Sequence, residues 1–301
     1  MKESEILKTL FGKLVPPEDD CYYLKPGRLV TTDSLSEGTH FLHEWSSPED
    51  LAIKLIEVNV SDISASGGVP DYCFLNLGLS KISQKRTWVE RFSKTLRKKL
   101  RDYKMSLVGG DTFYSQTTTL SLTVLGRVKK PWLRSGGKHG DNLYVTGNLG
   151  LSELGFQTLK QNKEKKSQNE AIKKHLQPKS RANLVKHLLG YKINACMDIT
   201  DGLVQDAERL CLASKGKLRI RIEDIPLHPA AKLEIGISGC ITSGEELELL
   251  FLSNEELPKK IVNVPIHKIG NFQKGKPGLQ FLENGAEFFP HAKGFLHFSE
   301  E

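Results

Sequence analysis

The chain has 301 residues, of which 38% are hydrophobic and 26% are charged, and its formal net charge at pH 7 is +7. This length favours two domains, because a single hydrophobic core rarely serves more than about 250 to 300 residues. No apolar run approaches the roughly 20 residues that a membrane-spanning helix needs. Residues 1–5 lack the apolar core of a signal peptide, and the five cysteines show no metal-binding spacing. We therefore expect a cytoplasmic protein with buried, reduced thiols and no membrane segment.

The positive charges gather in two stretches, which raises the question of nucleic-acid binding. The first stretch, 94–104, is interleaved with apolar residues such as Phe92 and Leu96 at helical spacing. This pattern is typical of an amphipathic helix with a solvated basic face. The second stretch, 160–174, lies in a polar segment of low hydrophobicity. Neither pattern favours nucleic acid as a partner.

Periodicity and turn signals predict alternating helices and strands along the chain. The expected helices are 3–14, 47–62, 85–103, 153–159, 181–189 and 201–214. The expected strands are 29–32, 72–79, 105–108, 117–128, 142–146, 195–199 and 247–252. Helix 47–62 has the clearest start, because Ser47 suits the N-cap and Pro48 suits the first helical position. Residues 160–169 are expected to form a charged loop.

The turn-rich segment 135–141 predicts a joint between two domains, which we place at 1–135 and 136–301. Alternating elements in both halves predict an α/β or α+β architecture. No internal sequence repeat relates the two halves.

Several apolar segments end in an aspartate beside turn residues, and a tandem pair of aspartates stands near the N-terminus. These aspartates are Asp33, Asp62, Asp111, Asp198 with Asp201, and Asp19 with Asp20. Carboxylates that lie close together raise each other's pKa unless cations neutralise them, and Mg²⁺ prefers such oxygen ligands. We interpret the pattern as a converging acidic site for Mg²⁺-dependent phosphoryl chemistry. The alternative is that these aspartates cap helices or turns, and Asp62 could lie on the helix that begins at Ser47.

The segment 270–276 has the spacing of a phosphate-binding P-loop, but Pro277 follows where that motif needs a Ser or Thr hydroxyl. Proline also lacks the N–H group that such a loop would use. Other common kinase and hydrolase signatures are missing from the sequence. A phosphoryl-transfer enzyme with this sequence would therefore need a less common fold.

Taken together, the motifs resemble those of the thiamine-monophosphate kinases, within the aminoimidazole-ribonucleotide-synthetase-like ATP-binding superfamily. The similar strings span nearly the whole chain, at 19–21, 31–33, 37–41, 58–62, 107–112, 134–136, 140–141, 145–147, 197–203, 244–245 and 294–298. The position of His40 after the T-T-D string and the N-x-S-D string at 59–62 favour this family over its superfamily relatives.

The resemblance implies a reaction and a fold. ATP would donate its γ-phosphoryl group to thiamine monophosphate by direct in-line transfer with several Mg²⁺ ions, giving thiamine diphosphate and ADP. An N-terminal α/β domain would pair its sheet with a twin in a homodimer, forming a barrel across the dimer. A C-terminal α/β domain would close the active site.

The resemblance also implies roles for individual residues. The implied metal shell is Asp20, Thr31, Thr32, Asp33, Asp62, Asp111, Asp198 and Asp201, of which Asp62, Asp33 and Asp201 are the expected catalytic residues. The implied nucleotide contacts are Tyr103, Gly110, Asp111, Arg134 and Thr200. The implied contacts to thiamine monophosphate are His40, Glu245 and Phe295. Taken alone, His40 could equally be a surface or core histidine, and Arg134 could be a solvated hinge residue.

The sequence departs from the family pattern in three places, one of which is a shortened segment between Pro229 and Ser243. Glu18 stands where the family has glycine, and Glu246 and Leu247 replace an aspartate and a tyrosine after Gly244. These changes put substrate affinity in question more than metal binding. Two alternatives therefore stay open: a related ATP-dependent enzyme with another small acceptor, and a non-catalytic nucleotide-binding paralogue.

Overall fold

The computed structural model describes residues 3–12, 19–161 and 169–290. Its helices are α1 (Glu3–Phe11), α2 (Pro48–Ala65), α3 (Arg86–Asp102), α4 (Leu151–Lys160), α5 (Asn169–Leu176), α6 (Ala182–Leu188), α7 (Leu203–Ser214), α8 (Pro229–Ile241) and the short 3₁₀ helix η2 (Ile222–Asp224). Its strands are β1 (Tyr22–Leu24), β2 (Arg28–Ser36), β3 (Val69–Leu79), β4 (Ser106–Tyr114), β5 (Thr119–Arg127), β6 (Asn142–Thr146), β7 (Ile193–Asp198), β8 (Gly216–Arg221), β9 (Leu249–Ser253), β10 (Lys260–Ile261), β11 (Val264–Lys274), β12 (Gly278–Glu283) and β13 (Ala286–Phe288).

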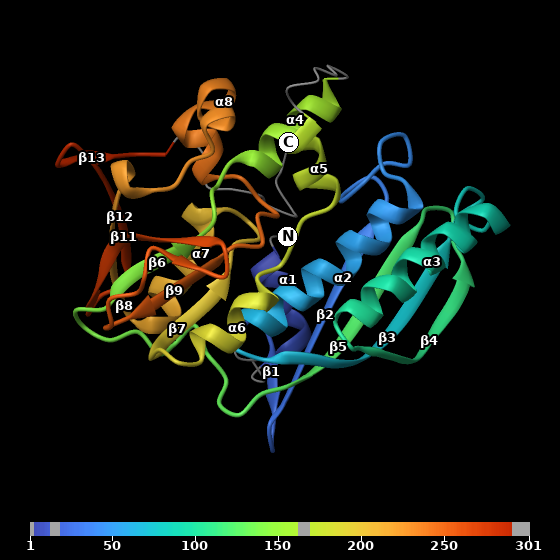
Figure 1. Ribbon diagram of the computed structural model, residues 1–301, viewed down its shortest axis with the longest axis horizontal. Coiled ribbons are helices and arrows are strands. Elements are labelled where there is room, and N and C mark those ends of the chain that lie inside the picture. Colours follow the sequence, from blue (N-terminus) through green and yellow to red (C-terminus); the bar gives the residue numbers. More distant parts are fainter. Residues whose placement is uncertain (1–2, 13–18, 162–168, 291–301) are drawn as a thin grey trace.

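The first sheet has five strands in the order β1-β2-β5-β3-β4, and helices α2 and α3 lie over one of its faces (Figure 1). Strand β5 alternates between buried and partly exposed residues along its length. The buried residues, Leu120, Leu122 and Val124, join the hydrophobic core that also contains apolar residues of α2 and α3. The two-residue period of a strand therefore turns one face of this sheet to the helices and leaves the other face open.

The second sheet runs in the order β13-β12-β8-β11-β6-β9-β7, with β10 paired to β11. Every residue of β9 is buried, because apolar side chains cover both faces of the sheet there. On one face the core includes residues of α7, and on the other it includes residues of α6 together with Ala65 of α2. The end of α2 therefore meets the second sheet as well as the first.

Helix α2 occupies the middle of the molecule, between the two sheets (Figure 1), and contacts β2, β5 and β7. Its start follows the sequence expectation: the Ser47 side chain accepts a hydrogen bond from the Asp50 N–H group, and the Asp50 side chain accepts one from the Ser47 N–H group. This capping box satisfies donors that a helix start leaves free. Nearly all of α2 is buried, so its polar residues face other parts of the protein rather than solvent.

Most predicted elements are present, with corrected bounds. Strand β2 continues through Asp33 to Ser36, so the expectation that the strand ends before Asp33 was wrong. Strand β4 likewise continues through Asp111 to Tyr114. Asp62 lies on α2, as the capping signal at Ser47 suggested, and not at a strand end. Of the four expected strand ends, only Asp198 is one, as the last residue of β7.

Smaller differences lie elsewhere. Helix α1 ends at Phe11, and Leu14 of the expected helix 3–14 falls outside the described residues. The expected loop 160–169 is bordered by α4, which reaches Lys160, and by α5, which begins at Asn169. The connection 128–141 joins the two sheets, and the division between domains after residue 135 stays a prediction.

The five cysteines are all free and buried, in agreement with the expected thiols. Among the residues described, no helix is both long enough and apolar enough to cross a membrane.

Candidate active site

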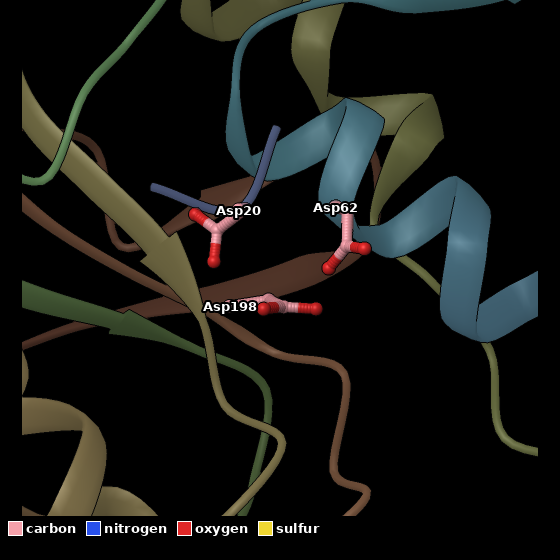
Figure 2. Close-up of side chains that lie close together, drawn as sticks. All are labelled: Asp20, Asp62 and Asp198. Carbon is pink, nitrogen blue, oxygen red and sulfur yellow. The ribbon is translucent and has the colours of Figure 1, made fainter. Parts of the chain in front are cut away.

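Three carboxylates from distant parts of the chain converge between the two sheets. Asp20 precedes β1, Asp62 lies near the end of α2, and Asp198 ends β7. One carboxylate oxygen from each residue lies within 4.8 Å of those from the other two. Figure 2 shows the three side chains grouped around one space, with α2 supplying Asp62. The expected convergence of aspartates is thus present for these three.

Neighbouring side chains hold each of the three carboxylates in place. The Thr31 hydroxyl donates a 2.6 Å hydrogen bond to Asp62 Oδ2. The Ser61 hydroxyl, one residue before Asp62 on α2, donates to Asp198 Oδ2. The remaining partner is Arg134, whose guanidinium group donates to Asp20 Oδ1. Residues from β2, α2 and the connection between the sheets therefore fix the cluster.

Burial and mutual repulsion make these carboxylates hold protons more tightly than ordinary aspartates. Burial raises the pKa of Asp62 well above its usual value, and the neighbouring Asp33 and Asp198 raise it further. Burial likewise raises the pKa of Asp198, with Asp20 as the next contribution. A divalent cation among these oxygens would supply the missing positive charge, and hard oxygen donors are the ligands that Mg²⁺ prefers. The donor set therefore fits the Mg²⁺ that the sequence predicts.

The β2 residues divide between two faces of the strand. Thr31 and Asp33 share the face toward α2, where the Asp33 N–H group donates to Asn59 Oδ1 at 3.0 Å. The Thr32 hydroxyl lies on the other face, 3.1 Å from that of Thr123. The structure therefore brings Thr31 and Asp33 to the cluster, whereas the side chain of Thr32 points away from it.

Gly110 and Asp111 lie on β4, where every residue is exposed. Gly110 has a φ of 151°, and a Cβ atom there would lie only 1.8 Å from the Leu75 carbonyl oxygen on β3. Asp111 accepts a hydrogen bond from the next N–H group in the strand, that of Thr112. Asp111 is not part of the cluster of three carboxylates. Because β4 is an edge strand, these residues are reached from outside the molecule.

Tyr103 follows α3, and its hydroxyl donates a 2.7 Å hydrogen bond to Glu57 Oε2 on α2. The same hydroxyl lies 3.2 Å from that of Ser180. Tyr103 therefore ties α3 to α2 in this structure.

The turn after β7 holds Thr200 and Asp201, and an unpredicted residue organises it. Asp206, in the first turn of α7, accepts hydrogen bonds from the N–H groups of both residues at 3.0 Å. Arg209 pairs with Asp201 at 2.5 Å and with Asp206 at 2.8 Å. The position of Asp206 in a first helical turn was the sequence signal that could have revealed this role.

Of the residues implied for the acceptor, two lie close together. Lys54 of α2 places its Nζ atom 2.6 Å from Glu245 Oε2 and 3.4 Å from the His40 carbonyl oxygen. The third, Phe295, falls outside the described residues. Lys54 escaped the sequence analysis because a lysine in an amphipathic helix usually faces solvent.

The two departures after Gly244 have structural roles. Glu246 Oε1 accepts hydrogen bonds from the N–H groups of Gly150 and Ser152, at 2.7 and 3.2 Å, at the start of α4. The Leu247 side chain is fully buried. Glu246 therefore serves the start of α4 and Leu247 the core, and Glu245 beside them keeps a partly exposed carboxylate. Glu18 lies outside the described residues.

Comparison with known proteins places this arrangement in a family. Residues 18–128 match the N-terminal domain of AIR synthase related proteins, and residues 138–260 match the C-terminal domain. The chain is 43% identical over 301 residues to the thiamine-monophosphate kinase of Leptospira interrogans, covering 99% of this chain and 98% of that protein. It is 33% identical over 302 residues to the thiamine-monophosphate kinase of Aquifex aeolicus, covering 97% and 95%.

The chain belongs to the thiamine-monophosphate kinase family. Within this family, the solved structure described as AaThiL complexed with AMPPCP and TMP superposes with a TM-score of 0.87 at 31% identity, covering 99% of this chain and 97% of that one. A structure of the hydrogenase maturation protein HypE in complex with ATP reaches a TM-score of 0.74 at 15% identity, which shows a shared fold alone. The thiamine-monophosphate kinase fold thus confirms the predicted two-part α/β architecture.

Proposed function

We propose that this chain transfers the γ-phosphoryl group of ATP to thiamine monophosphate, giving thiamine diphosphate and ADP. The observation that carries the proposal is the convergence of Asp20, Asp62 and Asp198 within 4.8 Å, in a chain that matches thiamine-monophosphate kinases over nearly its whole length. A buried acidic cluster of this kind suits a reaction in which highly charged phosphates must be held together.

The transfer is direct. A phosphate oxygen of thiamine monophosphate forms a bond to the γ-phosphorus of ATP, while the bond from that phosphorus to the bridging oxygen breaks and ADP leaves with the electron pair. The acceptor phosphate is largely ionised at neutral pH, because its second pKa is about 6. It therefore needs little help from a general base. Asp62, with Asp33 beside it and Asp201 in the turn after β7, would act by positioning and charge rather than by proton transfer.

Magnesium is the proposed cation. Asp20, Asp62 and Asp198 would hold it most directly, and Thr31, Asp33 and Asp201 complete the proposed shell. Thr32 and Asp111, which the sequence also placed in the shell, lie outside the cluster, on the other face of β2 and on the exposed strand β4. When bound, Mg²⁺ supplies positive charge to the phosphate oxygens of the reactants. Thr31 and Ser61 keep the Asp62 and Asp198 carboxylates oriented for this task.

The proposed nucleotide contacts are Tyr103, Gly110, Asp111, Arg134 and Thr200. Arg134 has the strongest support, because its guanidinium group lies beside the cluster and its buried Nε atom has no hydrogen-bond partner among the described residues. A guanidinium donor suits a phosphate oxygen at that position. Gly110 lets β4 approach β3 closely, because a side chain there would collide with the backbone of Leu75.

The proposed acceptor contacts are His40, Glu245 and Phe295. Glu245 offers a carboxylate to a cationic ring, and His40 lies near it through the shared contact with Lys54. An aromatic residue such as Phe295 would cover a flat cationic heterocycle.

We also propose that the chain forms a homodimer through the open face of the first sheet. This face exposes large apolar side chains, among them Tyr72 and Phe74 on β3 and Phe113 on β4. Contiguous exposed apolar residues on an open sheet mark an interaction surface. A second copy of the sheet would cover them and would also bring a neighbour to Gly110 and Asp111.

A cytoplasmic location completes the proposal. All five cysteines are free thiols, as expected for a protein of a reducing compartment.

The structure removes the main argument for a non-catalytic nucleotide-binding protein. That alternative rested on the replacements at Glu246 and Leu247, and both residues serve the start of α4 and the core rather than the site. Another small acceptor remains the competing hypothesis, and direct assay decides it.

The test is to incubate the chain with ATP, Mg²⁺ and thiamine monophosphate and to separate the products by chromatography. We expect thiamine diphosphate and ADP in equal amounts. Parallel reactions with thiamine and with a ribonucleotide amide should give no phosphorylated product. Turnover of the ribonucleotide amide without turnover of thiamine monophosphate would overturn the proposal.

A further inference from the structure

A buried lysine on α2 joins the two described residues that we propose for acceptor binding. Lys54 is only 3% exposed. An ammonium group is removed from water at high cost unless oxygen atoms compensate it. Its Nζ atom has two such oxygens, Glu245 Oε2 at 2.6 Å and the His40 carbonyl oxygen at 3.4 Å. Lys54 therefore links the loop after β2 to the segment before β9.

The Lys54 charge keeps Glu245 ionised. Burial would raise the pKa of the Glu245 carboxyl group, but Lys54 and then His175 lower it, and the net shift is downward. His175 of α5 places its Nδ1 atom 3.6 Å from the same oxygen, Oε2. Burial and the nearby Lys54 lower the pKa of His175 itself to about 4, so it is neutral at neutral pH. Lys54 is then the charged partner of Glu245.

The backbone around Glu245 is also fixed. Glu245 has a φ of 54°, in the left-handed region that side chains other than glycine rarely adopt. Its N–H group donates a 2.7 Å hydrogen bond to the carbonyl oxygen of Thr200. The Glu245 side chain nevertheless keeps 26% of its surface exposed, so a bound molecule can reach it. Backbone and side chain are thus both held while the carboxylate stays accessible.

Helix α2 connects this arrangement to the acidic cluster. Asp62 lies about two turns beyond Lys54 on the same buried helix, and the helix begins with a complete capping box. The same helix therefore carries Lys54, which contacts the proposed acceptor residues, and Asp62, which belongs to the acidic cluster.

We propose that Lys54 is a positioning residue for the acceptor, because it fixes the Glu245 carboxylate and the loop at His40. These two groups then hold the cationic ring of the acceptor in a fixed position relative to the acidic cluster. This inference rests on the proposed function, because it takes thiamine monophosphate as the acceptor. Lys54 is not a catalytic residue, since it acts through Glu245 and His40.

The test compares Lys54→Met with the native chain by steady-state kinetics. Methionine keeps the length of the side chain and removes its charge. We expect the KM for thiamine monophosphate to rise on the order of 10-fold, while the KM for ATP changes by less than about 2-fold. A purely structural role would raise both KM values or lower kcat alone, and either result would overturn the inference.

A double-mutant cycle with Glu245→Gln guards against misfolding, because the double variant leaves no unpaired carboxylate. Lys54→Met should change the KM for thiamine monophosphate by less than about 2-fold in the Glu245→Gln background. The same factor in both backgrounds would show that Lys54 does not act through Glu245.

The matched control is Lys99→Met, which removes the ammonium partner of another buried carboxylate of α2, Glu57. We expect its KM for thiamine monophosphate to stay near the native value. An equal rise in Lys99→Met would mean general loosening of α2 and would contradict the inference. The same assay measures turnover by the native chain. If the native chain forms no product, the proposed function is overturned. If it forms product but Lys54→Met raises the KM for ATP as much as the KM for thiamine monophosphate, only the role of Lys54 is overturned.

Discussion

The hydroxyl of Thr31 on β2 donates a 2.6 Å hydrogen bond to the carboxylate of Asp62 on α2. This contact joins the first sheet to the central helix at the acidic cluster. Because a hydrogen bond to a metal-binding carboxylate sets its orientation, Thr31→Val should weaken Mg²⁺ affinity about 10-fold. Calorimetric titration of the nucleotide-free protein with Mg²⁺ measures the effect. Thr119→Val, the same change on the neighbouring strand β5, should leave the affinity unchanged, and an equal loss in both variants would contradict this role for Thr31.

The acidic cluster makes Mg²⁺ binding dependent on pH. Burial raises the folded-state pKa of Asp62 and Asp198 above the ordinary value of 3.8. Above that pH the metal-free folded protein therefore binds more protons than the unfolded chain. The stability that these bound protons contribute to the folded state is lost as the pH rises. The proposed Mg²⁺ would bind the ionised carboxylates, so its affinity should rise over the same range.

Melting temperatures with a chelator and with Mg²⁺, between about pH 5 and pH 8, test this prediction. The stabilisation by Mg²⁺ should grow with pH in the native chain and grow less in Asp198→Asn. A pH-independent stabilisation that is equal in both proteins would show that these carboxylates do not bind the ion.

The capping box at the start of α2 contributes to global stability. Ser47→Ala removes the acceptor for the Asp50 N–H group, and loss of such a cap costs about 1 kcal/mol. Urea unfolding should show this decrease in the free energy of unfolding. Thr87→Ala, at an exposed position in the first turn of α3, should change it by less than about 0.5 kcal/mol. Equal values for the two variants would mean that the capping box does not stabilise α2.

The open face of the first sheet should carry the homodimer interface. Phe74 is 42% exposed there, and Phe74→Glu would bury a charge in the interface. In sedimentation experiments the native chain should have twice the chain mass of 33.7 kDa, and the variant should dissociate. Leu212→Glu, on the exposed side of α7, should remain dimeric. A native chain that sediments as a monomer would rule out this interface.

The sequence predicted long, strongly patterned elements well and misjudged where individual aspartates lie on them. The capping signal at Ser47 located α2, because Ser, Pro and acidic residues act locally on a helix start. The strand-end interpretation failed for Asp33 and Asp111, because pairing with neighbouring strands extends β2 and β4 past the apolar runs. Helix α5 was missed because its residues are mostly polar and show little apolar periodicity. It is held by packing of its buried residues, Ala171 and His175.

The acidic cluster itself was predicted in part. Convergence of Asp20, Asp62 and Asp198 was expected, but the contact of Ser61 with Asp198 depends on how α2 approaches the second sheet, and that of Arg134 with Asp20 joins segments 114 residues apart. Such contacts between residues far apart in sequence leave no periodic signal. Asp206, which supports the turn at Thr200 from the next helix, is a local contact that its place in the first turn of α7 could have revealed.

The most direct test of the central claim is ATP-dependent formation of thiamine diphosphate by the native chain and by Asp62→Asn at saturating Mg²⁺. The account predicts product in the native chain and a loss of kcat of at least about 100-fold in the variant, because a charge that holds the reacting phosphates is removed. Asp224→Asn, which changes a carboxylate that pairs with Arg221 outside the cluster, should keep the native rate. Unchanged turnover in Asp62→Asn, or no product from the native chain, would contradict the account.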